Sequence, residues 1–141
     1  MIAKQFGNTW IIRIRRGEEI VSTLQKICVD NDIRLGVVSA IGAVNEATIG
    51  LYDVKNKIYH SESYTGDMEI VNLAGNVSTM DDEIYLHLHV SLSDTSHKLF
   101  GGHLNRAVVS ATCEIFIQTI PGEINRFKDD ETGLNLIEFK D

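Results

Sequence analysis

The chain has 141 residues, of which 43% are apolar and 23% charged, and its formal net charge is −7. These are ordinary values for a globular protein, and no run approaches the eighteen or so apolar residues of a membrane-spanning helix. A net negative charge also disfavours a free-standing nucleic-acid-binding protein, because phosphate contacts supply most of the affinity of that class. With no signal-peptide pattern at the N-terminus, we expect one cytoplasmic domain over residues 1–141.

The first predicted elements are a strand and a helix. Residues 10–14 are rich in β-branched side chains, which favours a strand, and Arg16-Gly17 predicts a turn. Glu18 and Glu19 suit the positive end of a helix dipole, so the helix is expected to begin there and to end at Asn31-Asp32. The apolar residues of its buried face are Ile20, Val21, Leu24, Ile27 and Cys28.

The rest of the chain is predicted to form strands and turns. Strands are expected over residues 35–44, 47–52, 58–60, 69–77, 84–92, 98–104 and 107–119, with one or two short strands between residues 123 and 139. Side chains of Ile49 and Leu51 are expected on one face. One helix followed by seven or more strands with short connections predicts an α+β fold, a mainly antiparallel sheet with the helix packed on it.

Charge and cysteine positions each allow a simple interpretation. Lys4, Arg13, Arg15 and Arg16 give the first sixteen residues a charge of +4, and the remainder carries −11. This segment is either a local basic face or a solvated edge strand. The two cysteines, Cys28 and Cys113, lie in apolar surroundings and are predicted to be buried thiols without a disulfide.

Three histidines carry the strongest chemical signal. His87 and His89 are two residues apart on a predicted strand, so both imidazoles face the same side, opposite the apolar Leu86, Leu88 and Val90. His103 follows after a turn and a return, and Gly101 and Gly102 allow close backbone approach beside it. Three imidazoles with a fourth position open are typical of catalytic zinc. The alternative is that these histidines are ordinary polar residues, as we expect of His60 and His97.

Two carboxylates are candidates for a catalytic role beside such a site. Glu69 and Glu114 each lie in an otherwise apolar strand, where an unpaired charge is costly. In an enzyme, either Glu69 or Glu114 would transfer the proton, and Arg106 or Arg34 would hold a substrate carboxylate. Strand alternation that turns the two glutamates to solvent explains the same pattern.

Several motifs together resemble one known family. They are Gly66–Asn76, Leu86–Asp94 and Gly101–Leu104, with Arg16–Glu19 and Ser39–Ala43 near the start and Arg126–Leu134 near the end. They resemble the PPC domain, the plant and prokaryote conserved domain, over nearly the whole chain. Where the plant motif has an arginine after the glycine, this chain has Asp67, and it contains no AT-hook.

The resemblance implies a homotrimer and a DNA-binding, regulatory role for a stand-alone domain. The fold family is also similar to acetolactate decarboxylase, which binds zinc through a His-x-His pair and a later histidine, in the order of His87, His89 and His103. The first hypothesis is therefore a trimeric, DNA-binding domain that holds zinc or a similar divalent ion. The second is a zinc-dependent lyase or hydrolase that acts on a small polar metabolite, with a small anionic ligand as the expected partner.

Overall fold

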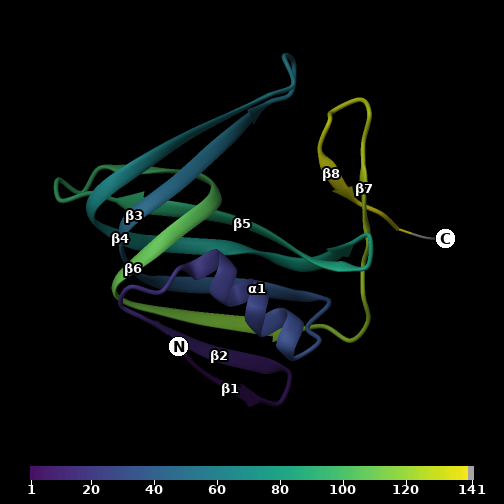
Figure 1. The fold of residues 1–141 in the computed structure, drawn as a ribbon, viewed down its shortest axis with the longest axis horizontal. Helices are drawn as coiled ribbons and strands as arrows, with labels where there is room; N and C mark the ends of the chain where they lie inside the picture. The colour runs from purple at the N-terminus through teal and green to yellow at the C-terminus, as the bar shows by residue number, and fades with distance from the viewer. Residues whose placement is uncertain (140–141) are drawn as a thin grey trace.

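The structure is a computed structural model that describes residues 1–139, and it contains one helix and eight strands (Figure 1). Six strands form the main sheet in the order β1-β2-β6-β3-β4-β5, and all its pairings are antiparallel. The predicted α+β class is confirmed. The elements are β1 (Ile2–Phe6), β2 (Thr9–Arg15), α1 (Ile20–Asp30), β3 (Gly36–Asp53), β4 (Ile58–Met80), β5 (Glu83–Ser93), β6 (Leu99–Thr119), β7 (Arg126–Lys128) and β8 (Asn135–Ile137).

The sheet closes on itself through β6. This strand pairs with β2 over residues 112–118, with β3 along most of its length, and with β5 over residues 99–103. Strands β3, β4, β5 and β6 therefore form a ring around an apolar interior, and β1 and β2 extend from one side of it. A second sheet of two strands, β7 and β8, follows the ring in the sequence. These are the short strands predicted between residues 123 and 139.

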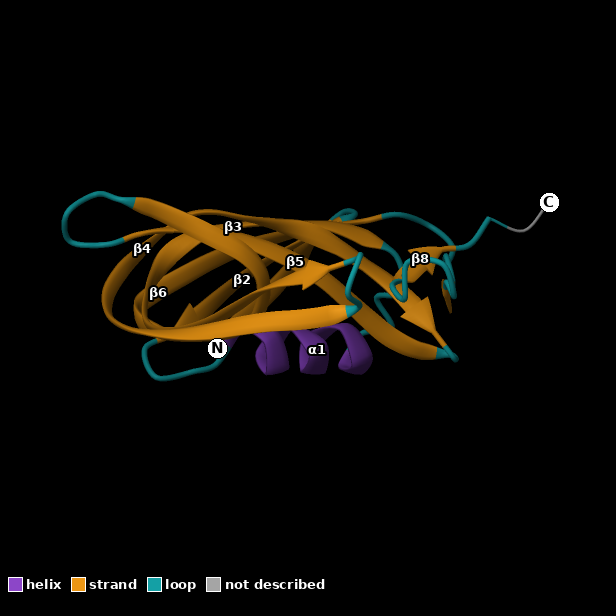
Figure 2. Ribbon diagram, turned by 90° about the horizontal axis from the view of Figure 1, so that it is seen from above, coloured by secondary structure: helices purple, strands orange, loops and turns teal. Residues whose placement is uncertain are grey.

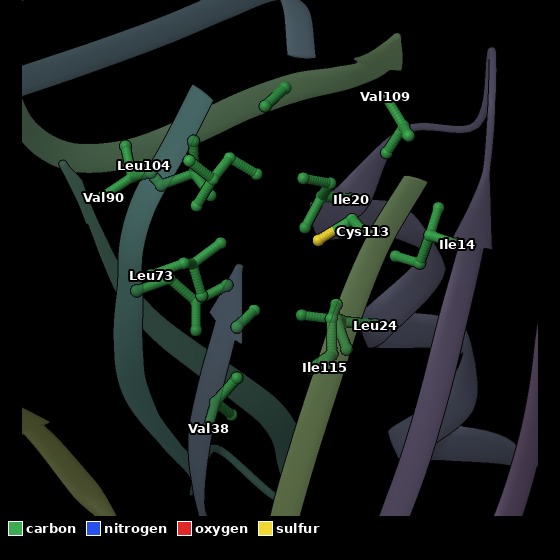
Figure 3. Packing of buried hydrophobic residues seen from close by; sticks show 14 of the residues in the cluster. Ile14, Ile20, Leu24, Val38, Leu73, Val90, Leu104, Val109, Cys113 and Ile115 are labelled. Carbon is green, nitrogen blue, oxygen red and sulfur yellow. The ribbon is translucent and has the colours of Figure 1, made fainter. Parts of the chain in front are cut away.

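Helix α1 lies along one face of the sheet (Figure 2). Glu19 caps its N-terminus by accepting hydrogen bonds from the backbone N–H groups of Val21 and Ser22. Four of the five predicted face residues are fully buried, and Val21 is half-buried. Figure 3 shows Leu24 of α1 beside Ile115 of β6, so the helix packs on the core where β6 lines it.

The strands are longer than the sequence predicts. The strands predicted over residues 35–44 and 47–52 merge into one strand, β3, and the same holds for the predicted pairs of strands within β4 and β6. Register shifts between Val44 and Glu46 change which face each side chain takes without ending the ladder. Past the ring, the β3–β4 hairpin projects away, so Ile49 is buried whereas Leu51 is 66% exposed. The regular pairing of Ile49 and Leu51 with β4 keeps both side chains on one face, as predicted, but only Ile49 lies over the core.

Both cysteines lie in the hydrophobic core. Cys28 and Cys113 are free and fully buried among the apolar residues of the cluster. Burial raises the pKa of each thiol to about 12, so both behave as small apolar side chains, as predicted. Within residues 1–139, no helix has the length and apolar character needed to cross a membrane.

Candidate metal centre

Strand β5 presents two of the three histidines on the outside of the ring. Leu88 and Val90 are buried in the ring interior, whereas His87 is half-buried and His89 exposed on the opposite face. The alternation predicted from the His-x-His pair is confirmed. This strand is held on both sides, by β4 opposite residues 83–93 and by β6 opposite residues 89–93, so the direction of both imidazoles is fixed.

His103 completes the group from the neighbouring strand. It lies directly opposite His89 in the β5–β6 pair, and the ring centroids are 5.6 Å apart. The centroid of His87 is 5.1 Å from that of His89 and 5.3 Å from that of His103. One ligand nitrogen from each of the three rings lies within 4.8 Å of the other two. The turn and return predicted between residues 89 and 103 therefore bring the three side chains together.

Glycines permit the close approach of the strands around this group. A Cβ atom on Gly101 would collide with the carbonyl of Val90, and one on Gly102 would lie 2.6 Å from the carbonyl oxygen of Gly50. Gly75 on β4 plays the same part beneath β5, because a Cβ atom there would meet the carbonyl of His87. The predicted role of Gly101 and Gly102 is confirmed, and Gly75 is an addition from the structure.

The electrostatic setting favours neutral imidazoles. Burial, followed by the nearby charge of Arg126, lowers the pKa of His87 to about 4. Burial and the neighbouring His89 also lower the pKa of His103. Both rings are therefore neutral at neutral pH, and the neutral form is the one that binds a metal ion.

A cavity of about 740 Å³ opens beside the three rings. The ring strands supply one side of it, and the β7–β8 segment supplies the other through Leu134, Asn135, Leu136 and Ile137. Tyr59, from the projecting β3–β4 hairpin, lines it as well and places its ring edge-on to His103, with 6.2 Å between centroids. The histidines thus line a pocket large enough for a small molecule.

Arg126 is the residue of this cavity that sequence reasoning missed. Its side chain is buried, and its guanidinium donates hydrogen bonds to the Ser78 hydroxyl, the Asn76 side-chain oxygen and the Asn135 carbonyl. It also lies over the Tyr85 ring, 4.9 Å from the centroid. A single arginine in a polar tail has no periodic pattern around it. The only available signal was its place in the family motif Arg126–Leu134.

The other candidates lie elsewhere. Glu69 is exposed opposite Ala43 and Ser93 and lines a separate cavity with His97, while Glu114 is exposed between Arg13 and Ile41. Neither glutamate lines the histidine cavity. Arg34 is paired with Asp82 and Glu123, and Arg106 with Glu46. A catalytic role for Glu69 or Glu114 stays a prediction, whereas the arginine that the structure places at the cavity is Arg126.

The fold and the histidine group together define a small antiparallel domain with a candidate metal site on the outside of a strand ring. The chain belongs to the Plants and Prokaryotes Conserved (PCC) domain family, whose model matches residues 1–121. This confirms the resemblance to the PPC domain. Strands β7 and β8, with Arg126, follow the matched part.

Solved structures support the same assignment. A candidate DNA-binding protein from Bacteroides thetaiotaomicron is 33% identical, with a TM-score of 0.96 over 98% of this chain and 96% of that one. A metal-containing protein from Archaeoglobus fulgidus is also 33% identical, with a TM-score of 0.88 over 99% of both chains. A Staphylococcus aureus protein similar to α-acetolactate decarboxylase shares the fold alone, at 12% identity and a TM-score of 0.58 over 89% of this chain and 56% of that one.

Curated relatives are much longer than this chain. A protein named bifunctional protein GlmU, from a Synechococcus strain, is 28% identical over 125 residues, which cover 86% of this chain and 19% of that protein. The chain therefore spans about a fifth of the length of the curated relatives that it matches.

Proposed function

We propose that this chain binds one divalent metal ion, zinc or a similar ion, through His87, His89 and His103. The observation that carries the proposal is the convergence of three imidazole nitrogens within 4.8 Å of one another, from rings that line a cavity. Nitrogens of a tetrahedral zinc site lie about 3.4 Å apart at the usual Zn–N bond lengths, so small side-chain rotations suffice. The metal-containing relative from Archaeoglobus fulgidus, 33% identical over 99% of the chain, supports the same reading.

Within this proposal, the protein's own groups prepare the site. Burial keeps His87 and His103 neutral, so little proton release accompanies binding at neutral pH. Strand pairing between His89 and His103 fixes the spacing of two ligands before any ion arrives. When bound, such an ion supplies Lewis acidity toward a ligand oxygen in the cavity.

The proposal includes a homotrimer built from one domain over residues 1–141. The sheet exposes apolar side chains on its outer surface: Ile11, Val37, Ile41, Val71 and Phe116 are each between 37% and 59% exposed. Ile11 and Phe116 are direct neighbours across β2 and β6. Exposed apolar groups gathered on adjacent strands are typical of surfaces between subunits.

The metal content of the protein tests the proposed metal site, and its molecular mass in solution tests the proposed homotrimer. Protein purified without a metal-affinity tag is expected to contain about one divalent ion per chain by mass spectrometry, and His89→Ala is expected to lose it. His97→Ala, a matched change on an exposed histidine outside the cavity, keeps the ion. Light scattering is expected to give three times the mass of the chain, and Phe116→Ser to reduce it. Metal-free wild-type protein that takes up no added ion contradicts the metal site.

A second candidate function is DNA binding, favoured by the description of the Bacteroides thetaiotaomicron relative and by exposed Lys4, Arg13, Arg15 and Arg16 on β1, β2 and the following turn. Glu114 lies opposite Arg13 and reduces this basic character. Binding of this kind is expected at low salt and to weaken steeply as salt rises, with a further loss in Arg15→Gln. A gel shift that is absent even at low salt excludes it.

A lyase or hydrolase activity is the alternative that the cavity itself favours. The volume of about 740 Å³ beside three histidines suits a small metabolite. In the described residues, no carboxylate lines the cavity, so Glu69 and Glu114 lack direct access within one subunit. A screen of small polar acids with metal-loaded protein tests this activity. Turnover is expected to be lost in His89→Ala, and Glu69→Gln tests whether that glutamate transfers a proton.

A further inference from the structure

Arg126 carries a buried positive charge at the wall of the histidine cavity. Its side chain is 5% exposed, and Tyr85 covers one face of the guanidinium. Its three hydrogen-bond partners are a hydroxyl, an amide oxygen and a backbone carbonyl, all of them neutral. These contacts orient the group without neutralising it.

The charge has no acidic partner among residues 1–139. None of the ion pairs in this part of the chain involves Arg126, and no aspartate or glutamate lines the cavity. Buried charges are normally paired, because removing an ion from water is costly. By contrast, the half-exposed Arg34 and Arg106 do have carboxylate partners. Because Arg126 lines the cavity, an anionic ligand bound there can pair with its guanidinium.

The donor count of Arg126 points to the kind of anion. A guanidinium has five N–H groups, and three are used by Ser78, Asn76 and Asn135. Two remain, which is the number that a carboxylate accepts from arginine in a bidentate pair. A phosphate group carries more charge and more acceptor oxygens, and among residues 1–139 the cavity offers it only this one cation.

We propose that the cavity binds a small carboxylic acid, with its carboxylate on Arg126 and a neighbouring oxygen directed at His87, His89 and His103. The inference rests on the proposed function, because the second oxygen faces the metal-binding group. A 2-hydroxy or 2-oxo acid has these two features on adjacent carbon atoms. Arg126 and the three histidines line the same cavity, so one small ligand can face both.

Lactate and lactamide are suitable probes, because they have nearly the same shape and lactamide carries a neutral amide in place of the carboxylate. In cobalt(II)-loaded protein, lactate is expected to change the visible spectrum at concentrations at least tenfold lower than lactamide. Arg126→Gln is expected to weaken lactate binding at least tenfold while keeping one ion per chain. Arg106→Gln, a surface arginine paired with Glu46 outside the cavity, is the matched control and is expected to bind lactate like the wild type.

A second readout does not depend on the metal or on a variant. The Nε–H signal of Arg126 in nuclear magnetic resonance is expected to shift with lactate and not with lactamide, in metal-free as well as loaded protein. Equal responses to lactate and lactamide, or equal lactate affinity in Arg126→Gln and wild type, overturn the inference even if one ion is bound per chain. Failure to bind any ion overturns the proposed metal site instead, and the Nε–H titration still decides whether Arg126 binds carboxylates. A shift with inorganic phosphate but not with lactate also contradicts the proposal.

Discussion

His89 and His103 are paired directly across β5 and β6, with their ring centroids 5.6 Å apart. Residues opposite each other in an antiparallel pair have a separation set by the backbone ladder, so these two side chains need no loop to bring them together. His87 joins them from the next outward position on β5. The candidate ligand set is therefore built on regular strands, where positions are more precise than on loops.

Gly75 controls how closely β4 supports this pair. A Cβ atom at residue 75 would collide with the backbone carbonyl of His87, so Gly75→Ala must displace β5 just where it carries the histidines. We expect at least a tenfold loss of zinc affinity and a lower free energy of unfolding by about 1–3 kcal/mol. Competition with a chromophoric chelator and urea unfolding give the two values.

Gly36→Ala is the matched control for that substitution. Gly36 is likewise crowded, with its hypothetical Cβ atom 2.9 Å from the Gln118 carbonyl oxygen, but it lies at the start of β3 and outside the cavity. It is expected to lower stability and to leave zinc affinity unchanged. Similar losses of affinity in both variants would mean that the effect of Gly75→Ala is general unfolding.

Local patterns were enough to predict the helix and the orientation of the histidine pair. Both depend on neighbours in sequence: the 3.6-residue period places Ile20, Leu24 and Ile27 on one face, and the two-residue period places His87 and His89 together. The return of His103 to the pair followed from a short turn. In each case the residues that come together are close to one another in the sequence.

Other features could not be predicted from the sequence, because they depend on contacts between residues far apart in the chain. The sequence predicts separate strands over residues 35–44 and 47–52, yet β3 is continuous because β4 and β6 hold it from both sides. Arg126 lies 50 residues from Asn76 and 48 from Ser78, so nothing around it in the sequence marks its place in the cavity. For the same reason, the proposed substrate arginines Arg34 and Arg106 could not be distinguished from it.

The metal-free protein is expected to lose stability as pH falls from about 6.5 to 4. Burial, with the charge of Arg126, lowers the pKa of His87 to about 4, whereas the unfolded chain has the ordinary value of 6.5. Between these values the unfolded state binds more protons, so acid favours unfolding. We expect a loss of about 1–2 kcal/mol after allowing for solvent screening of a partly exposed ring. Urea unfolding in the presence of a chelator, at pH 7 and pH 4.5, measures it.

His87→Gln isolates that contribution. The variant removes the titrating imidazole and is expected to have a flatter stability profile between pH 6.5 and 4. His60→Gln, on the exposed β3–β4 hairpin, is expected to keep the wild-type profile. Unchanged pH dependence in His87→Gln would assign the titration to other groups.

The two thiols are expected to be inert in the folded state. Burial raises the pKa values of Cys28 and Cys113 to about 12, so almost no thiolate exists at pH 8. Iodoacetamide at pH 8 is expected to leave both cysteines unmodified in native protein and to label both in 6 M guanidinium chloride. Rapid labelling of native Cys28, detected by mass spectrometry, would show that α1 opens from the sheet.

Glu19 is expected to hold α1 on the sheet. Its carboxylate accepts hydrogen bonds from Val21 N–H, from the Ser22 N–H and hydroxyl, and from Ala107 N–H on β6. Burial opposes its ionisation, but these bonds outweigh burial and keep its pKa below the ordinary value of 4.5. Glu19→Ala removes the cap and leaves the Ala107 N–H without its acceptor, so we expect the free energy of unfolding to fall by about 2–4 kcal/mol.

The pH dependence separates this role of Glu19 from simple packing. A lowered pKa stabilises the fold above the unfolded value of about 4.5, and the stabilisation is lost as pH falls through the folded value. The stability difference between wild type and Glu19→Gln is therefore expected to shrink below pH 4.5. Asp30→Ala, which removes an exposed pair with Lys26 on the same helix, is the control and is expected to change stability by less than about 0.5 kcal/mol. A Glu19→Gln variant as stable as wild type at pH 7 would show that the charge on this cap contributes nothing.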